Sequence, residues 1–193
     1  MKLPDKIYKE SAGGGKEFDL AAVNAERGDI FLNGDIVMNT AQSFASIMKY
    51  MQREGKKVTI YLNSLGGEVT AGLMIYDIIK SYPYDLKIVC TGLATSMGAI
   101  ILAGGRKGKR FILPHSKVMI HEPLISNGFG GSATTIEQKA KTILDVKQQL
   151  NEILAKHTGK SLKDIDKATA FDNFMTAEEA VRFGICDAIA TIY

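Results

Sequence analysis

The sequence predicts a single α/β domain in which helices alternate with the strands of a largely parallel sheet. At 193 residues the chain is long enough for one domain with a substantial core and too short for two. Hydrophobic residues make up 46% and charged residues 23%, which is the balance of a folded globular protein. Beyond Asp29, short apolar runs alternate with longer segments of helical periodicity, a pattern typical of βαβ units.

The first 28 residues differ from the rest of the chain because Gly13-Gly14-Gly15 lies there among charged and small residues. Such a composition buries little apolar surface and favours chain flexibility. We therefore expect residues 1–28 to form a flexible N-terminal segment, with ordered structure beginning near Asp29. Residues 29–193 are expected to form the domain.

Strands and helices are then predicted in alternation. A short strand at 30–32 precedes a helix with Phe44, Ile47, Met48 and Met51 on one face. Asn39 or Thr40 is the expected cap of this helix and Gly55 its expected end. Further strands are predicted over 58–62, 86–90, 111–113 and 117–120, and helices over 69–81, 96–103 and 133–157.

The C-terminal half contains the longest helical pattern, over about 133–157. Its apolar side chains lie on one wide seam, formed by Ile136, Ala140, Ile143, Leu144, Val146, Leu150, Ile153 and Leu154. We interpret this helix as an oligomerisation element, the alternative being an amphipathic helix that covers its own domain. A last helix should begin at Thr176, where Glu179 completes a capping-box pattern, and end at Gly184.

Composition also argues against several classes of protein. The formal charge is only +3, and we interpret the basic run Arg106–Arg110 as a solvated turn, so nucleic-acid binding is not expected. Cys90 and Cys186 lie in apolar stretches, which fits core thiols in a reducing compartment. With no signal-like start and no apolar run of about 18 residues, we expect a soluble, cytoplasmic protein without a membrane partner.

Ser96 is the first candidate for chemistry. It lies among small residues at a strand-to-helix junction, Cys90–Ala99, where unpaired backbone N–H groups suit a developing oxyanion. A serine there is also a good helix N-cap, and both interpretations stay open. The segment is not G-x-S-x-G, so it gives little support to an α/β-hydrolase.

A catalytic serine needs a base, and the chain has three histidines. His121 ends an apolar strand, at the sheet edge where α/β folds collect their sites, whereas His115 lies in a turn and His157 at the end of the long helix. The orienting carboxylate is not determined by spacing, which leaves five acidic residues open: Asp172, Asp164, Asp166, Asp187 and Glu122.

A second marked segment is the strand-to-helix turn Asn63–Val69, which contains Gly66-Gly67. It fits a phosphate cradle, an oxyanion-hole turn or an ordinary tight connection. The spacing of a nucleotide-binding P-loop is absent, and no histidine, cysteine or carboxylate cluster has metal-ligand spacing. We therefore expect neither a nucleotide nor a metal.

Six segments resemble the proteolytic subunit of the Clp protease family, both in their amino-acid sequences and in their order along the chain. The similarity runs from about Asp29 to Ala190. These segments are Tyr61–Gly72, Gly92–Gly98, Gly108–Pro114, Val118–Pro123, His157–Gly159 and Asp172–Ala180. The resemblance implies a serine peptidase with Ser96 as nucleophile, His121 as general base and Asp172 as orienting carboxylate.

The resemblance further implies an oxyanion hole made by the backbone N–H groups of Gly67 and Met97. An extended substrate would be held by strand-like main-chain pairing, without any cofactor, along two segments: Gly67, Glu68 and Val69, and Pro123, Leu124 and Ile125.

The implied fold is a crotonase-like α/β spiral of βαβ units with a long protruding handle helix. Members of the family form two stacked heptameric rings, in which the helix over 133–157 would interlock the rings. The expected partners are other copies of the chain, an ATP-dependent unfoldase of the AAA+ class, and unfolded polypeptide substrates.

Some positions depart from the family pattern and motivate alternatives. Leu65 replaces the usual proline before Gly66-Gly67, and Glu68 adds a charge beside the expected oxyanion hole. The segment Ala168–Phe171 lacks the charged residues that usually pair between rings. One alternative is a regulatory or structural subunit of a mixed ring with a paralogue, and another is an acyl-CoA hydratase or isomerase.

Overall fold

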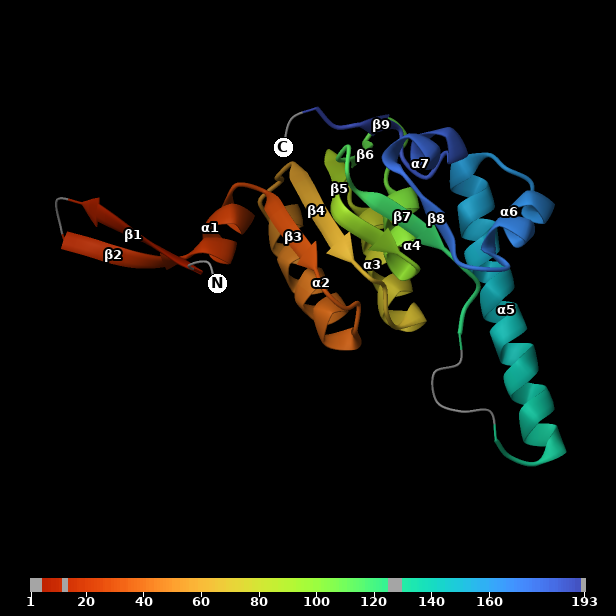
Figure 1. Cartoon of the computed structure of the whole chain (residues 1–193). Helices are drawn as coiled ribbons and strands as arrows, with labels where there is room; N and C mark the ends of the chain where they lie inside the picture. The colour runs from red at the N-terminus through yellow and green to blue at the C-terminus, as the bar shows by residue number, and fades with distance from the viewer. Residues whose placement is uncertain (1–4, 12–13, 125–129, 192–193) are drawn as a thin grey trace.

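In the computed structural model, which describes residues 5–11, 14–124 and 130–191, a seven-stranded sheet forms the centre of the chain (Figure 1). The strands are β3 (Asp29–Asn33), β4 (Val58–Ser64), β5 (Leu86–Thr95), β6 (Arg110–Ile112), β7 (Lys117–Ile120), β8 (Asn173–Met175) and β9 (Ala188–Ile189). All pairs in this sheet are parallel except β7 with β8. The predicted α/β class with a largely parallel sheet is therefore confirmed.

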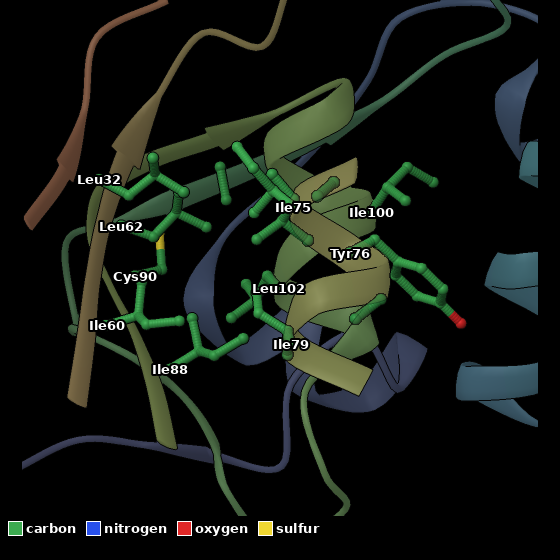
Figure 2. Packing of buried hydrophobic residues seen from close by; sticks show 14 of the residues in the cluster. Leu32, Ile60, Leu62, Ile75, Tyr76, Ile79, Ile88, Cys90, Ile100 and Leu102 are labelled. Atoms are coloured by element: carbon green, nitrogen blue, oxygen red, sulfur yellow. The ribbon is translucent and has the colours of Figure 1, made fainter. Parts of the chain in front are cut away.

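Three helices pack on one face of this sheet: α2 (Met38–Arg53), α3 (Val69–Ser81) and α4 (Met97–Gly104). Side chains along β4 alternate between more and less buried, because only one face of the sheet is covered by these helices. On the opposite face, Phe31 of β3 and Tyr61 of β4 stack with ring centroids 4.8 Å apart. Figure 2 shows the core between sheet and helices, with Ile60, Leu62 and Ile88 facing Ile75 and Ile79.

The order of the sheet depends on β5, the longest strand. Its first half pairs with β6 from Ile88 to Cys90, and its second half pairs with β7 from Leu93 to Thr95. Because β5 exchanges one neighbour for another along its length, the ends of β5 and β7 meet at the same edge of the sheet.

Three helices of the C-terminal half follow: α5 (Ala133–Thr158), α6 (Leu162–Thr169) and α7 (Ala177–Phe183). The capping box at Thr176 and Glu179 is present, as predicted. Helix α5 extends well past the sheet in Figure 1. Its apolar seam is divided, because Leu150 and Leu154 are buried in the chain's own core while Leu144 is 61% exposed.

Regular structure begins earlier than we expected from the sequence. Residues Lys6–Ser11 (β1) and Gly14–Asp19 (β2) pair as an antiparallel hairpin, and α1 (Leu20–Glu26) buries Val23 and Ala25. The expectation that order starts near Asp29 was therefore wrong for secondary structure. The two strands pair the backbone N–H and C=O groups of each other in hydrogen bonds. This pairing does not need a buried apolar face, which the few apolar residues of this segment could not form.

The cap of α2 also differs from expectation, because Val37 occupies the N-cap position instead of Asn39 or Thr40. A larger difference concerns the basic run Arg106–Arg110. Arg110 is only 3% exposed, so it is not part of a solvated turn.

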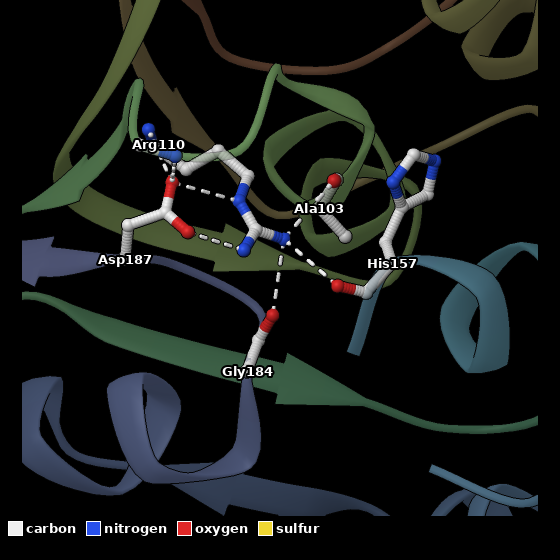
Figure 3. Close-up of polar contacts among 6 residues, drawn as sticks. Ala103, Arg110, His157, Gly184 and Asp187 are labelled. Atoms are coloured by element: carbon white, nitrogen blue, oxygen red, sulfur yellow. Dashed lines mark hydrogen bonds and ion pairs between the residues drawn. The ribbon is translucent and has the colours of Figure 1, made fainter. Parts of the chain in front are cut away.

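The environment of Arg110 explains its burial (Figure 3). Its guanidinium pairs with Asp187 and also donates to the carbonyls of Ala103, His157 and Gly184, at the C-terminal ends of α4, α5 and α7. These carbonyls lack helical partners and carry partial negative charge. Arg110 therefore joins three helix ends in the interior, a role that depends on tertiary structure.

Candidate active site

Ser96 lies between the end of β5 at Thr95 and the start of α4 at Met97. Its φ of 55° and ψ of −118° make it the one non-glycine residue with positive φ in the described ranges. Such a conformation costs on the order of 1–3 kcal/mol and is common at functional sites. Although Ser96 occupies the N-cap position, its side chain makes no capping hydrogen bond to α4. The hydroxyl is thus available for another partner.

That partner is His121, whose Nε2 lies 2.9 Å from Ser96 Oγ. The pairing of β5 with β7 explains the contact, since Thr95 and Met119 are partners in a parallel register. Ser96 and His121 each follow directly on the end of one of these strands. The histidine side chain is only 14% exposed. The sheet therefore holds both groups at its carboxyl edge.

Asp172 reaches the other nitrogen of the same ring, with Oδ1 3.3 Å from His121 Nδ1. Its place follows from β8, a strand of three residues that the sequence did not predict. In the antiparallel pair of β7 and β8, Ile120 is opposite Asn173, so His121 and Asp172 are the next residues along. The Asp172 side chain is 63% exposed.

The other carboxylates that spacing left open are engaged elsewhere. Asp187 pairs with Arg110, and Asp164 accepts from the Ser161 hydroxyl at 2.7 Å. Asp166 and Glu122 both bind the Lys147 ammonium, at 2.9 and 3.0 Å. Asp172 is the carboxylate that reaches the imidazole of His121, which agrees with what the family resemblance implies.

His157 is disfavoured as a base by its surroundings. Its Nε2 hydrogen-bonds the Tyr76 hydroxyl at 2.8 Å, and His157 is not among the residues that line the cleft around Ser96. Burial, followed by the charges of Lys80, Arg110 and Lys156, lowers the pKa of His157 to about 4. This imidazole is thus a neutral packing group near neutral pH. His115 lies exposed in the turn before β7.

The glycine turn after β4 lies against Ser96. A side chain at Gly66, where φ is +96°, would bring its Cβ to 2.8 Å from Ser96 Cβ and from the Thr95 carbonyl oxygen. At Gly67, φ is +149° and a Cβ would lie 2.2 Å from the Ile36 carbonyl oxygen. Only glycine allows this approach of backbone to backbone. The N–H groups of Gly67 and Met97 have no acceptor within the described residues.

Two backbone hydrogen bonds hold the turn in place: Ile36 N–H to the Gly66 carbonyl at 2.8 Å and Glu68 N–H to the Ile36 carbonyl at 2.7 Å. From the sequence, the Glu68 charge was expected beside the oxyanion hole. In the structure, Glu68 Oε2 accepts from the Met38 N–H at 3.2 Å, at the start of α2. A carboxylate there is stabilised by the helix dipole.

Ser64 is a residue whose role the sequence did not reveal. It is 2% exposed, and its hydroxyl donates to the Gly34 carbonyl at 2.6 Å while accepting from the Gly66 N–H at 3.0 Å. It therefore shapes the turn that contacts Ser96. A buried polar residue at the end of an apolar strand was the available signal, because such a hydroxyl needs partners on both sides.

A cleft of about 710 Å³ contains Ser96 and His121. Gly67, Glu68 and Val69 line one side, and Pro123 and Leu124 line another, so five of the six expected substrate-binding residues share this cleft. Ile125 lies outside the described residues. The apolar floor comes from two helices and consists of Met97, Ile100, Leu150 and Leu154.

Helix α5 braces the histidine and the carboxylate from outside the sheet. Lys147 bridges Glu122, next to His121, and Asp166 of α6, the helix that leads to Asp172. The Glu122 N–H also donates to the Thr169 carbonyl at 2.7 Å. The side chain of Lys147 is 24% exposed, and its hydrogen bonds to Asp166 and then Glu122 raise its pKa. This brace was not apparent from the sequence.

Within the described ranges, no three side chains among histidine, cysteine and acidic residues come together as a metal site. None of the helices in those ranges is both long and apolar enough to span a bilayer.

The Clp protease family model matches residues 12–192, nearly the whole chain and every residue of the cleft described above. This match extends the resemblance seen in six separate segments to one continuous alignment. The chain belongs to the Clp protease family, a family of peptidases.

Proposed function

We propose that this chain is a serine endopeptidase that hydrolyses peptide bonds of unfolded polypeptides, with Ser96, His121 and Asp172 as its catalytic triad. The observation that carries the proposal is the chain of contacts from Ser96 Oγ to His121 Nε2, at 2.9 Å, and from His121 Nδ1 to Asp172 Oδ1, at 3.3 Å. The first distance lies within the reach required for proton transfer and the second is slightly longer, as is common before substrate binds.

In this mechanism His121 Nε2 takes the proton of Ser96 as the hydroxyl oxygen attacks the substrate carbonyl. Asp172 accepts a hydrogen bond from Nδ1–H and stabilises the imidazolium that forms. The N–H groups of Gly67 and Met97 donate to the developing oxyanion, and such donors contribute about 3–4 kcal/mol each in related sites. His121 then protonates the leaving amine, and water activated by the same ring hydrolyses the acyl-enzyme.

The test is covalent modification by a fluorophosphonate, located by mass spectrometry. We expect labelling of Ser96 alone, its loss in Ser96→Ala, and its retention in the control Ser81→Ala, because Ser81 lies at the end of α3 outside the cleft. Hydrolysis of an unfolded polypeptide should disappear with the same variant. Native protein that neither labels nor hydrolyses would refute the proposal.

We also propose that the chain works in heptameric rings, stacked in pairs, and receives substrates from an AAA+ unfoldase in the cytoplasm. Support comes from α5, which extends past the sheet and leaves Leu144 61% exposed. Native mass spectrometry should give a mass of fourteen 21.0 kDa chains. A monomer that hydrolyses peptides at full rate would contradict the ring.

A mixed ring with a paralogue is a second candidate, favoured by one observation. Phe171, in the uncharged segment before Asp172, is 86% exposed and has no charged neighbour in that segment for pairing across rings. Full peptidase activity of the purified homo-oligomer would exclude this candidate. An acyl-CoA hydratase has no such support, because the described lining of the cleft contains no lysine or arginine for the phosphates of CoA.

A further inference from the structure

The cleft around Ser96 is acidic although the chain as a whole is basic. The formal charge of the chain is +3, yet among the described residues that line the cleft the only full charges are those of Asp35 and Glu68. His121 is the other titratable group in the lining. Residues 125–129, which follow the lining residue Leu124, contain no charged side chain. The charge of the cleft thus has one sign.

Both carboxylates lie close to the proposed oxyanion hole. Ile36 and Gly67 form an isolated parallel bridge, and Asp35 and Glu68 flank it, one residue before Ile36 and one residue after Gly67. Both side chains belong to exposed residues. A side chain of a bound peptide that projects from beside the scissile bond would therefore meet two negative charges.

Among the residues that the structure describes, no cationic side chain pairs with either carboxylate. Glu68 Oε2 accepts from the Met38 N–H, and Oε1 has no hydrogen-bond donor within the described residues. Within the same ranges the Asp35 carboxylate has neither a donor nor an ion-pair partner, while its backbone carbonyl accepts from Thr40. The Met38 N–H also restrains Glu68, so its charge stays at the cleft wall.

We infer that Asp35 and Glu68 are specificity-determining residues that select substrates with a lysine or arginine next to the scissile bond. The inference rests on the proposed peptidase function. The apolar floor of Met97, Ile100 and Leu154 accepts an apolar side chain, so the favoured substrates are segments in which apolar and cationic residues adjoin. An exposed charge pair is weak because water screens it, so the preference expected from two carboxylates is modest, roughly 3–10-fold.

The test uses internally quenched peptides that are identical except for lysine, glutamine or glutamate beside the cleavage site. We expect kcat/KM to follow the order lysine, glutamine, glutamate, with about 3–10-fold between the extremes at low ionic strength. The ratio should fall towards one when NaCl is raised from about 0.05 to 0.5 M, because exposed charges are then screened.

The double variant Asp35→Asn with Glu68→Gln should bring the ratio close to one. Glutamine at position 68 still offers an oxygen to the Met38 N–H, so the cap of α2 is kept. The matched control is Glu54→Gln with Asp77→Asn, which removes the same charge from exposed residues outside the cleft and should leave the ratio unchanged.

Binding separates this inference from the proposed function. Anisotropy of the same labelled peptides, measured with Ser96→Ala, reports charge preference without turnover. A preference for lysine that disappears when Asp35→Asn and Glu68→Gln are added supports the inference even if no hydrolysis is found. Equal affinity for the lysine and glutamate peptides would overturn it even if the native protein is an active peptidase.

Discussion

The two sides of the cleft are built in different ways. Ser96 and the Gly66–Glu68 turn follow the central strands β4 and β5, which pair along most of their length and in which most side chains are buried. His121 and Asp172 lie at its margin, on the four-residue β7 and beside the three-residue β8. The nucleophile side is therefore rigid through packing, whereas the base and carboxylate depend on a few peripheral contacts.

Because of this difference, substitutions on the two sides of the cleft should affect folding stability and catalytic activity to different degrees. A buried residue near the centre contributes to both, because removing it disturbs packing as well as geometry. A residue at the margin, such as Asp172 with a side chain 63% exposed, contributes little to folding but sets the position of a reacting group. Substitutions on the two sides should therefore have distinguishable signatures.

The largest expected effect is that of Asp172→Asn. An amide no longer holds the required tautomer of His121, and in comparable triads this change lowers kcat by about 10³–10⁴-fold, or roughly 4–5.5 kcal/mol. Because the side chain is 63% exposed, the thermal midpoint should not change. The measurement is kcat beside differential scanning calorimetry, with Asp145→Asn on α5 as control. A variant with native kcat would remove Asp172 from the triad.

Next in size is Asp187→Asn, which should affect folding. The side chains of Arg110 and Asp187 are only 4% and 14% exposed, and breaking such a buried pair costs about 3–5 kcal/mol. Urea unfolding measures the loss. If the variant and the native chain had the same midpoint of urea unfolding, Arg110 would not join the helix ends.

The same carboxylate predicts a dependence on pH. Burial alone would raise the pKa of Asp187, but the hydrogen bonds and charge of Arg110 outweigh it and lower the pKa. The contribution of this pair is therefore present above the unfolded-state pKa of about 3.9 and is lost as pH falls through the lower folded-state value. Asp187→Asn should accordingly show less loss of stability between pH 5 and 2 than the native chain, when both are followed by circular dichroism.

Gly66→Ala tests the central side of the cleft. Its Cβ would lie 2.8 Å from Ser96 Cβ in a backbone with φ of +96°, so we expect kcat/KM to fall by about 10²-fold, or roughly 2.7 kcal/mol. Gly108→Ala is the matched control, since φ there is +81° and nothing lies within 4 Å of the added Cβ. Both variants bear backbone strain of about 1–2 kcal/mol, but only the first should lose activity. Equal activities would show that the contact with Ser96 is unimportant.

The smallest effect is expected for Lys147→Met at the margin. The Glu122 and Asp166 side chains are 43% and 58% exposed, so the bridge should contribute only about 0–1 kcal/mol to stability. We expect kcat to fall by about 3–10-fold, less than 1.4 kcal/mol, with KM unchanged, because His121 and Asp172 are held less well.

Lys147→Arg should restore kcat because it keeps the positive charge between the two carboxylates. Lys141→Met on the same helix is the control, since this exposed lysine has no ion pair among the described residues. If Lys147→Met lowered the thermal midpoint and kcat in equal measure, the bridge would be structural and not a positioning contact.

The sequence alone predicted the α/β class and most of the strands and helices. It also indicated the glycine turn, the candidate serine and three candidate histidines. These features are local: apolar periodicity follows the repeat of a strand or helix, and glycine or a capping pattern marks where the chain turns. The boundaries of α3, Val69–Ser81, agree with the prediction because apolar positions and turn residues coincide there.

Local spacing left open which carboxylate reaches His121; the family resemblance implied Asp172, and the tertiary structure gives the physical reason for the contact. Five acids were compatible with spacing, and the choice depends on β8, whose three residues carry too little periodicity to be recognised. Its antiparallel register with β7 brings together residues far apart in the chain. The same holds for Arg110, Lys147 and the charge of the cleft, because pairing between distant segments is set by packing of the whole chain and not by local sequence.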